Sequence, residues 1–61
     1  MKNYCFEIVS GDYEGETFFV QAKSKADAFK VARKVAADGG KVLCTGVYDD
    51  EYADILGYDT Y

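Results

Sequence analysis

The sequence predicts a two-layer α+β domain in which one helix packs on one face of a sheet formed by an antiparallel β-hairpin and a third strand. Three observations support this prediction. The chain has 61 residues, which is enough for a single domain over residues 1–61. Two segments with a period of two flank a short loop that has glycine at both ends. A segment with helical periodicity then leads to a third strand-like segment, so the order is β-β-α-β.

The first third of the chain has the pattern of a hairpin. Residues 3–10 and 16–22 show the alternation of half-buried strands. The residues that would share one face are Tyr4, Phe6 and Ile8 in the first segment and Phe18, Val20 and Ala22 in the second. Residues 11–15 connect them, and a short glycine-bearing loop between two such strands predicts a hairpin. Much of the core is expected to come from Phe6, Phe18, Phe19 and Phe29.

A helix is predicted to follow the hairpin. Ser24 can cap its first turn, and Asp27 three residues later resembles the acid of a capping box. Apolar residues recur at helical spacing and form one stripe, which Phe29 flanks. The stripe consists of Ala28, Val31, Ala32, Val35 and Ala36. Its small alanines would let the helix lie close to the sheet. The sequence Asp38-Gly39-Gly40 is expected to end the helix, with a glycine in the left-handed conformation.

The last part of the chain has two possible structures. Residues 41–48 have the composition of a third strand. A short helix can then begin at Asp49 or Asp50 and run through Leu56. In that case the side chains expected to dock on the sheet are Tyr52, Ile55 and Leu56. A fourth strand over residues 52–58 is the alternative.

The residue types argue against catalysis. The chain has no histidine, the commonest general base and metal ligand. Its two serines, Ser10 and Ser24, fit a turn and a cap, and no phosphate-binding loop is present. The acids of the tail lack the spacing of a calcium loop. We therefore expect no catalytic residue, no cofactor, no metal and no enzymatic activity. Cys5 and Cys44 are expected to be buried free thiols, with a bridge between paired strands as the alternative.

Charge is unevenly distributed along the sequence. The net charge is −4, yet residues 1–46 hold all seven Lys and Arg against six acids, and residues 47–61 hold five acids without a base. Acids lie beside tyrosines in the tail and in the hairpin loop. The candidate partner-binding residues are Asp12, Tyr13, Glu14, Tyr48, Asp49, Asp50, Glu51, Tyr52 and Asp54. Such a surface suits a basic protein partner and can imitate a nucleic-acid backbone. Solubilising charge that also suits a helix dipole is the alternative.

The junction between the second strand and the helix carries a family resemblance. Residues 20–24 read V-x-A-x-S and run directly into residues 25–32, which read x-A-D-A-x-x-x-A. This sequence pattern resembles that of small phage and mobile-element proteins, including some anti-CRISPR proteins with a β-β-α-β fold. The resemblance covers roughly residues 4–47. The resemblance implies a non-enzymatic inhibitor that occupies a site on a bacterial nuclease complex such as a CRISPR effector. It carries no binding residue over to this chain.

Two other functions remain open at this stage. The chain can be a generic interaction module, or a homodimer joined through a sheet edge or exposed aromatic residues. It can also bind nucleic acid weakly through the helix face that carries Lys30, Arg33 and Lys34, although the acidic balance disfavours this. No apolar run is long enough for a transmembrane helix and the N-terminus does not have the form of a signal peptide. The expected location is the cytoplasm, that of a bacterial host cell if the resemblance holds.

Overall fold

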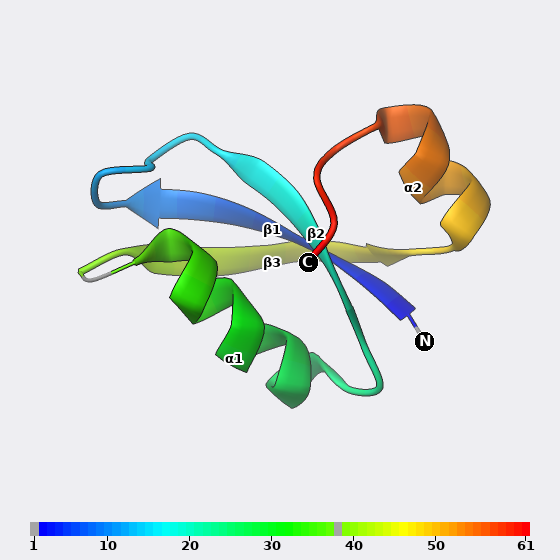
Figure 1. Ribbon diagram of the computed structural model, residues 1–61, viewed down its shortest axis with the longest axis horizontal. Helices are drawn as coiled ribbons and strands as arrows, with labels where there is room; N and C mark the ends of the chain where they lie inside the picture. The colour runs from blue at the N-terminus through cyan, green and yellow to red at the C-terminus, as the bar shows by residue number, and fades with distance from the viewer. Residues whose placement is uncertain (1, 38) are drawn as a thin grey trace.

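The computed structural model describes residues 2–37 and 39–61 and has the predicted α+β fold (Figure 1). The elements follow in the order β1 (Lys2–Ser10), β2 (Thr17–Ala22), α1 (Lys25–Ala36), β3 (Lys41–Tyr48) and α2 (Asp50–Leu56). The three strands form one sheet in the order β2-β1-β3, and both pairings are antiparallel. β1 is therefore the central strand, and β2 and β3 are the two edges.

The main core lies between α1 and one face of the sheet (Figure 1). The sheet contributes Tyr4, Phe6, Ile8, Phe18, Val20 and Ala22, and α1 contributes Ala28, Ala32 and Ala36. This row of alanines lets the helix approach the strands closely. The predicted stripe was too wide, because Val31 lies at the edge of the row and is exposed. Phe29 is half-buried instead, and its ring meets the Phe6 ring edge-on with the centroids 5.0 Å apart.

The two ends of α1 differ in how well the sequence predicted them. At the start, the backbone N–H of Asp27 donates to Ser24 Oγ at 3.2 Å, which confirms the predicted cap. At the end, the positive φ expected at a glycine begins earlier, and it does so at an alanine. Ala37 is the C-terminal capping residue with φ 66° and ψ −172°, and Gly39 also has a positive φ. Asp38, part of the predicted helix end, lies outside the described residues.

The opposite face of the sheet is covered at one end by α2, which confirms the helix over the alternative strand at 52–58. Phe19 is fully buried on this face, and its ring packs against those of Tyr48 and Tyr58. Tyr52 stacks on Tyr48 with the ring centroids 4.9 Å apart. The expected docking of Ile55 is wrong: its side chain is 80% exposed, because so short a helix presents only one narrow side to the sheet.

After α2 the chain pairs with the edge of β2. The backbone N–H of Phe19 donates to Asp59 O at 2.7 Å, and Tyr61 N–H donates back to Phe19 O at 2.8 Å. Gln21 N–H donates to Tyr61 O at 3.0 Å. The bridge between Phe19 and Thr60 is parallel. This contact was not predicted from the sequence, and it lies after the segment 52–58 that was the alternative fourth strand.

Both cysteines are free thiols. Cys5 is buried and pairs with Gly46, whereas the half-buried Cys44 pairs with Phe6 and packs against the core under α1. Residues directly opposite in an antiparallel pair share a face, so the two thiols lie on opposite faces of the sheet. This arrangement explains why the adjacent strands are not bridged.

Candidate binding groove

The predicted acidic residues form two clusters at opposite ends of the molecule (Figure 1). The hairpin cluster consists of Asp12, Tyr13 and Glu14 in the loop between β1 and β2. The α2 cluster consists of Tyr48, Asp49, Asp50, Glu51, Tyr52 and Asp54. Because they lie at opposite ends, the two clusters are two separate surfaces.

Part of the α2 cluster supports the fold. Asp49 is the N-terminal cap of α2, and its Oδ1 accepts from the backbone N–H of Tyr52 at 2.8 Å. Asp50 Oδ1 accepts from the side-chain amide of the buried Asn3 at 2.7 Å. The same Asn3 amide donates to Tyr48 O at 3.3 Å. Glu51 and Asp54 are exposed, as Asp49 and Asp50 also are.

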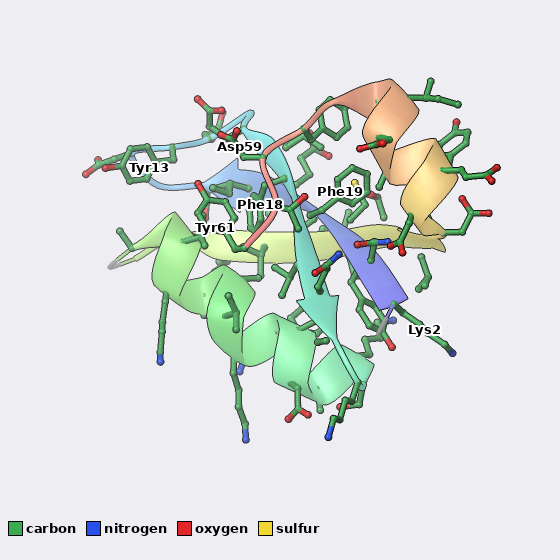
Figure 2. The ribbon with its side chains drawn as sticks, turned by 45° about the vertical axis from the view of Figure 1, so that its right-hand side comes forward. Lys2, Tyr13, Phe18, Phe19, Asp59 and Tyr61 are labelled. Carbon is green, nitrogen blue, oxygen red and sulfur yellow. The ribbon has the colours of Figure 1, made fainter. Side chains whose placement is uncertain are left out.

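A groove of about 520 Å³ opens beside the hairpin cluster. It lies between the hairpin loop, the C-terminal end of α1 and the tail that pairs with β2 (Figure 2). Its lining includes Tyr13, Glu16, Phe18, Lys34, Asp59 and Tyr61, and we call it the tyrosine groove. A second groove, of about 280 Å³, lies between α1 and the start of β3. Concave sites with an apolar lining and a few polar groups are where proteins usually bind ligands.

Backbone hydrogen bonds hold two walls of the tyrosine groove. In the hairpin loop, Glu16 N–H donates to Tyr13 O at 3.1 Å and Gly15 N–H donates to Ile8 O at 2.8 Å. The tail wall is held by its pairing with β2. The Tyr61 ring also meets the buried Phe18 ring edge-on with the centroids 5.5 Å apart. The groove is therefore preorganised on both sides, which lowers the entropy cost of binding.

The lining combines aromatic surface with opposite charges. Tyr13 and Tyr61 are both about half exposed, and Figure 2 shows them at the same end of the molecule as Asp59. Glu16 and Asp59 supply two carboxylates, and Lys34 at the end of α1 is the one base in the lining. The groove thus offers a net negative site with aromatic walls.

The sequence indicated Tyr13 from the loop composition and Lys34 as part of a basic helix face, and both line this groove. Asp59 and Tyr61 were not among the candidates. The available signal was the repeat of tyrosine and acid in Tyr58-Asp59-Thr60-Tyr61, which resembles the pattern in the hairpin loop. Nothing local in that repeat showed that it would return to β2.

The basic face proposed for nucleic-acid binding is divided. Lys34 lines the tyrosine groove, whereas the Arg33 guanidinium lies over the Phe29 ring at 5.6 Å from its centroid. Lys30 is exposed. Lys34 and Arg33 therefore lie in two different places, and the three bases do not form one continuous basic surface.

Some features are absent from the part of the chain that the structure describes. No three His, Cys, Asp or Glu side chains there are grouped in a way that could hold a metal ion. No helix within residues 2–37 and 39–61 has the length and apolar character needed to cross a membrane.

Comparisons with family models, with curated proteins and with solved structures found no match to this chain. The resemblance to small anti-CRISPR proteins therefore stays a prediction.

Proposed function

We propose that this chain is a non-enzymatic binding protein that holds a basic segment of a protein partner in the tyrosine groove. The observation that carries the proposal is the pairing of two half-exposed tyrosines, Tyr13 and Tyr61, with the carboxylates of Glu16 and Asp59 in one preorganised concavity. Each group on its own is ordinary at a protein surface. Their convergence from the hairpin loop and the tail supports a binding role.

The lining suits the two parts of a lysine or arginine side chain. The aliphatic stem can lie on the half-exposed ring of Tyr61, which packs against the buried Phe18. The cationic head can rest against a tyrosine ring and meet a carboxylate, and a cation over an aromatic face gains about 0.5–2 kcal/mol. Lys34 places a positive charge on the α1 side of the groove. This charge suits a backbone carbonyl or a carboxylate of the bound partner segment. The groove therefore favours a peptide with a basic side chain over a free cation.

An inhibitory role follows if the bound segment normally contacts nucleic acid. Occupying the groove would remove that basic segment from the phosphate backbone, and complementary charge would speed the encounter. The exposed carboxylates of Glu51 and Asp54 at the other end offer a second acidic contact for a large partner. The specific form of the proposal is thus an inhibitor of a nuclease complex with a basic surface.

The proposal is tested with labelled peptides, since the partner is unidentified. An arginine-containing peptide and its glutamate-substituted counterpart are titrated with the chain, and binding is followed by fluorescence anisotropy. We expect the arginine peptide alone to bind, with an affinity that falls as salt is raised. The double variant Tyr13→Ala with Tyr61→Ala should lose at least about ten-fold in affinity, because aromatic anchors dominate such interfaces.

A matched pair of variants separates the groove from general acidity. Glu16→Gln with Asp59→Asn and Glu51→Gln with Asp54→Asn each remove two negative charges, the first pair in the groove and the second on α2. Only the groove pair should weaken the arginine peptide strongly. Equal losses in both variants would mean that the peptide reads net charge alone, and the proposed site would be wrong.

A further inference from the structure

The outer edge of β3 has no backbone partner among the described residues. All its ladder bonds go to β1, and the backbone hydrogen bonds outside helices and strands involve none of residues 41–48. Of its side chains, Leu43 is 54% exposed and Val47 is 49% exposed. An open strand with exposed apolar residues is a template for pairing with another strand.

The usual protections of an edge strand are sparse here. The chain contains no proline, and the only charged residue within β3 is Lys41 at its start. Two irregularities interrupt the pairing with β1: a bulge between Cys44 and Gly46, and a register shift between Ile8 and Ser10. The edge of β2, in contrast, is blocked by the tail that bonds to Phe19 and Gln21. Within residues 2–37 and 39–61, the edge available to an incoming strand is therefore that of β3.

Charge favours a second copy in the antiparallel orientation. β3 begins at Lys41 and runs directly into Asp49, Asp50 and Glu51. Antiparallel pairing of two β3 strands places the basic start of each beside the acidic end of the other. A parallel arrangement would instead place like charges together, which is unfavourable.

The bulge gives this pairing a matching register. Val42 and Val47 pair with Ile8 and Tyr4, so both lie on the face covered by α1. Leu43 and Gly46 lie on the other face, because they pair with Glu7 and Cys5. A two-fold axis normal to the sheet keeps faces together. It can place Val42 opposite Val47 of the second copy, and Leu43 opposite Gly46 of the second copy.

A shallow groove beside this edge completes the complementarity. It has a volume of about 280 Å³ and is lined by Phe29, Arg33, Gly40, Lys41 and Val42. In the antiparallel register, the exposed Val47 of the second copy lies next to Val42 and can fill this groove. The apolar part of its lining would then be covered from both copies.

We propose that the chain forms a homodimer through antiparallel pairing of β3 with β3 of a second copy. The two three-stranded sheets join into one six-stranded sheet, with both α1 helices on the same face. The tyrosine groove lies at the closed edge of each copy and remains open in this dimer. The inference is therefore independent of the proposed function, and either can fail alone.

The oligomeric state tests the proposal. Size exclusion with light scattering, together with sedimentation over micromolar to millimolar concentrations, should give twice the mass of one chain at the high end. Leu43→Lys and Val47→Lys should each raise the dimer dissociation constant at least about ten-fold, because a buried charge replaces an apolar contact. Val9→Lys is the matched control: Val9 is 43% exposed but lies on the central strand, so the dimer should persist.

The orientation is tested separately by isotope-filtered nuclear Overhauser spectra on a mixture of labelled and unlabelled chains. We expect contacts between the methyl groups of Val42 in one copy and Val47 in the other. Circular dichroism confirms that each lysine variant is folded. The proposal is overturned if the wild type is monomeric at every concentration. It is also overturned if the edge variants dimerise as the wild type does, or if Val42 contacts Val42 of the second copy instead.

Discussion

The two edges of the sheet differ in how the chain treats them. The edge of β2 is covered by the tail, whose backbone bonds to Phe19 and Gln21 occupy three of its polar groups. The edge of β3 has no such cover in the described residues, and its exposed side chains include Leu43 and Val47. The closed edge also carries the tyrosine groove, because the tail that closes it forms one wall. One segment thus both removes an aggregation-prone edge and builds a binding surface.

The largest effect on the closed edge is expected when the Phe19 side chain is removed. Its fully buried ring packs against Tyr48 and Tyr58, and its backbone bonds to the tail, so it holds both the end of β3 and the closing segment. Phe19→Ala should lower the free energy of unfolding by about 4 kcal/mol, as expected for a buried phenylalanine. Urea denaturation measures this loss. Hydrogen exchange should show the amide of Gln21 losing protection before the ladder between β1 and β3.

A milder variant keeps this test decisive if Phe19→Ala does not fold, since a loss of that size approaches the whole stability of a small domain. Phe19→Leu retains most of the buried volume and should cost about 1 kcal/mol. The amide of Gln21 should still exchange faster than in the wild type. Unchanged protection in both variants would show that the tail is held without Phe19.

The next largest effect is expected at the junction between the end of β3 and the start of α2. Asn3 donates to Tyr48 O at the end of β3 and to the Asp50 carboxylate at the start of α2, and it is buried. Asn3→Ala should therefore cost about 2 kcal/mol, since one of the bonds is to a charged group. Chemical denaturation of Asn3→Ala, Asp50→Ala and the double variant gives their coupling energy.

The matched control for this cycle is Asp54→Ala, which removes an exposed acid from the same helix. A surface substitution of this kind should change the stability by less than about 0.5 kcal/mol. A coupling energy near zero between Asn3 and Asp50, or an equal loss for Asp54, would show that the bond does not fix α2. The Asp50 carboxylate would then be unconnected with the fold, and Asp49 would remain the acid that supports α2.

The sequence predicted those parts of the fold whose signal is local. The strands predicted from the period of two and the cap at Ser24 depend on neighbouring residues, and each appeared where it was expected. Residues 3–6 and 18–20 are buried on both faces of the sheet, in contrast to the predicted half-buried alternation. The tail on β2 was not predictable in this way. Its bonds at Phe19 are between backbone groups, which carry no residue preference, and they join segments far apart in the chain.

The same physics limited the prediction of the candidate site. Tyr13 was found because its loop combines glycine, acids and an aromatic residue within a few positions. Asp59 and Tyr61 become part of the groove only after the tail has turned back at Gly57, which takes the left-handed conformation. Two acids predicted to bind a partner, Asp49 and Asp50, also form hydrogen bonds that support the fold. Composition identified the kind of surface but could not place it.

The smallest predicted effect lies at Ala37, in the turn between the groove and the start of the open edge. Ala37 lines the tyrosine groove and has φ 66° and ψ −172°, a region that side-chain-bearing residues rarely adopt. Ala37→Gly removes this strain, although glycine gains entropy in the unfolded state. The net result should be a stabilisation of about 0.5–1 kcal/mol, measured by thermal and urea unfolding. Ala26→Gly, at an exposed position within α1, should instead destabilise by about 1 kcal/mol. If both glycine variants lower the stability equally, the backbone conformation of Ala37 stores no strain.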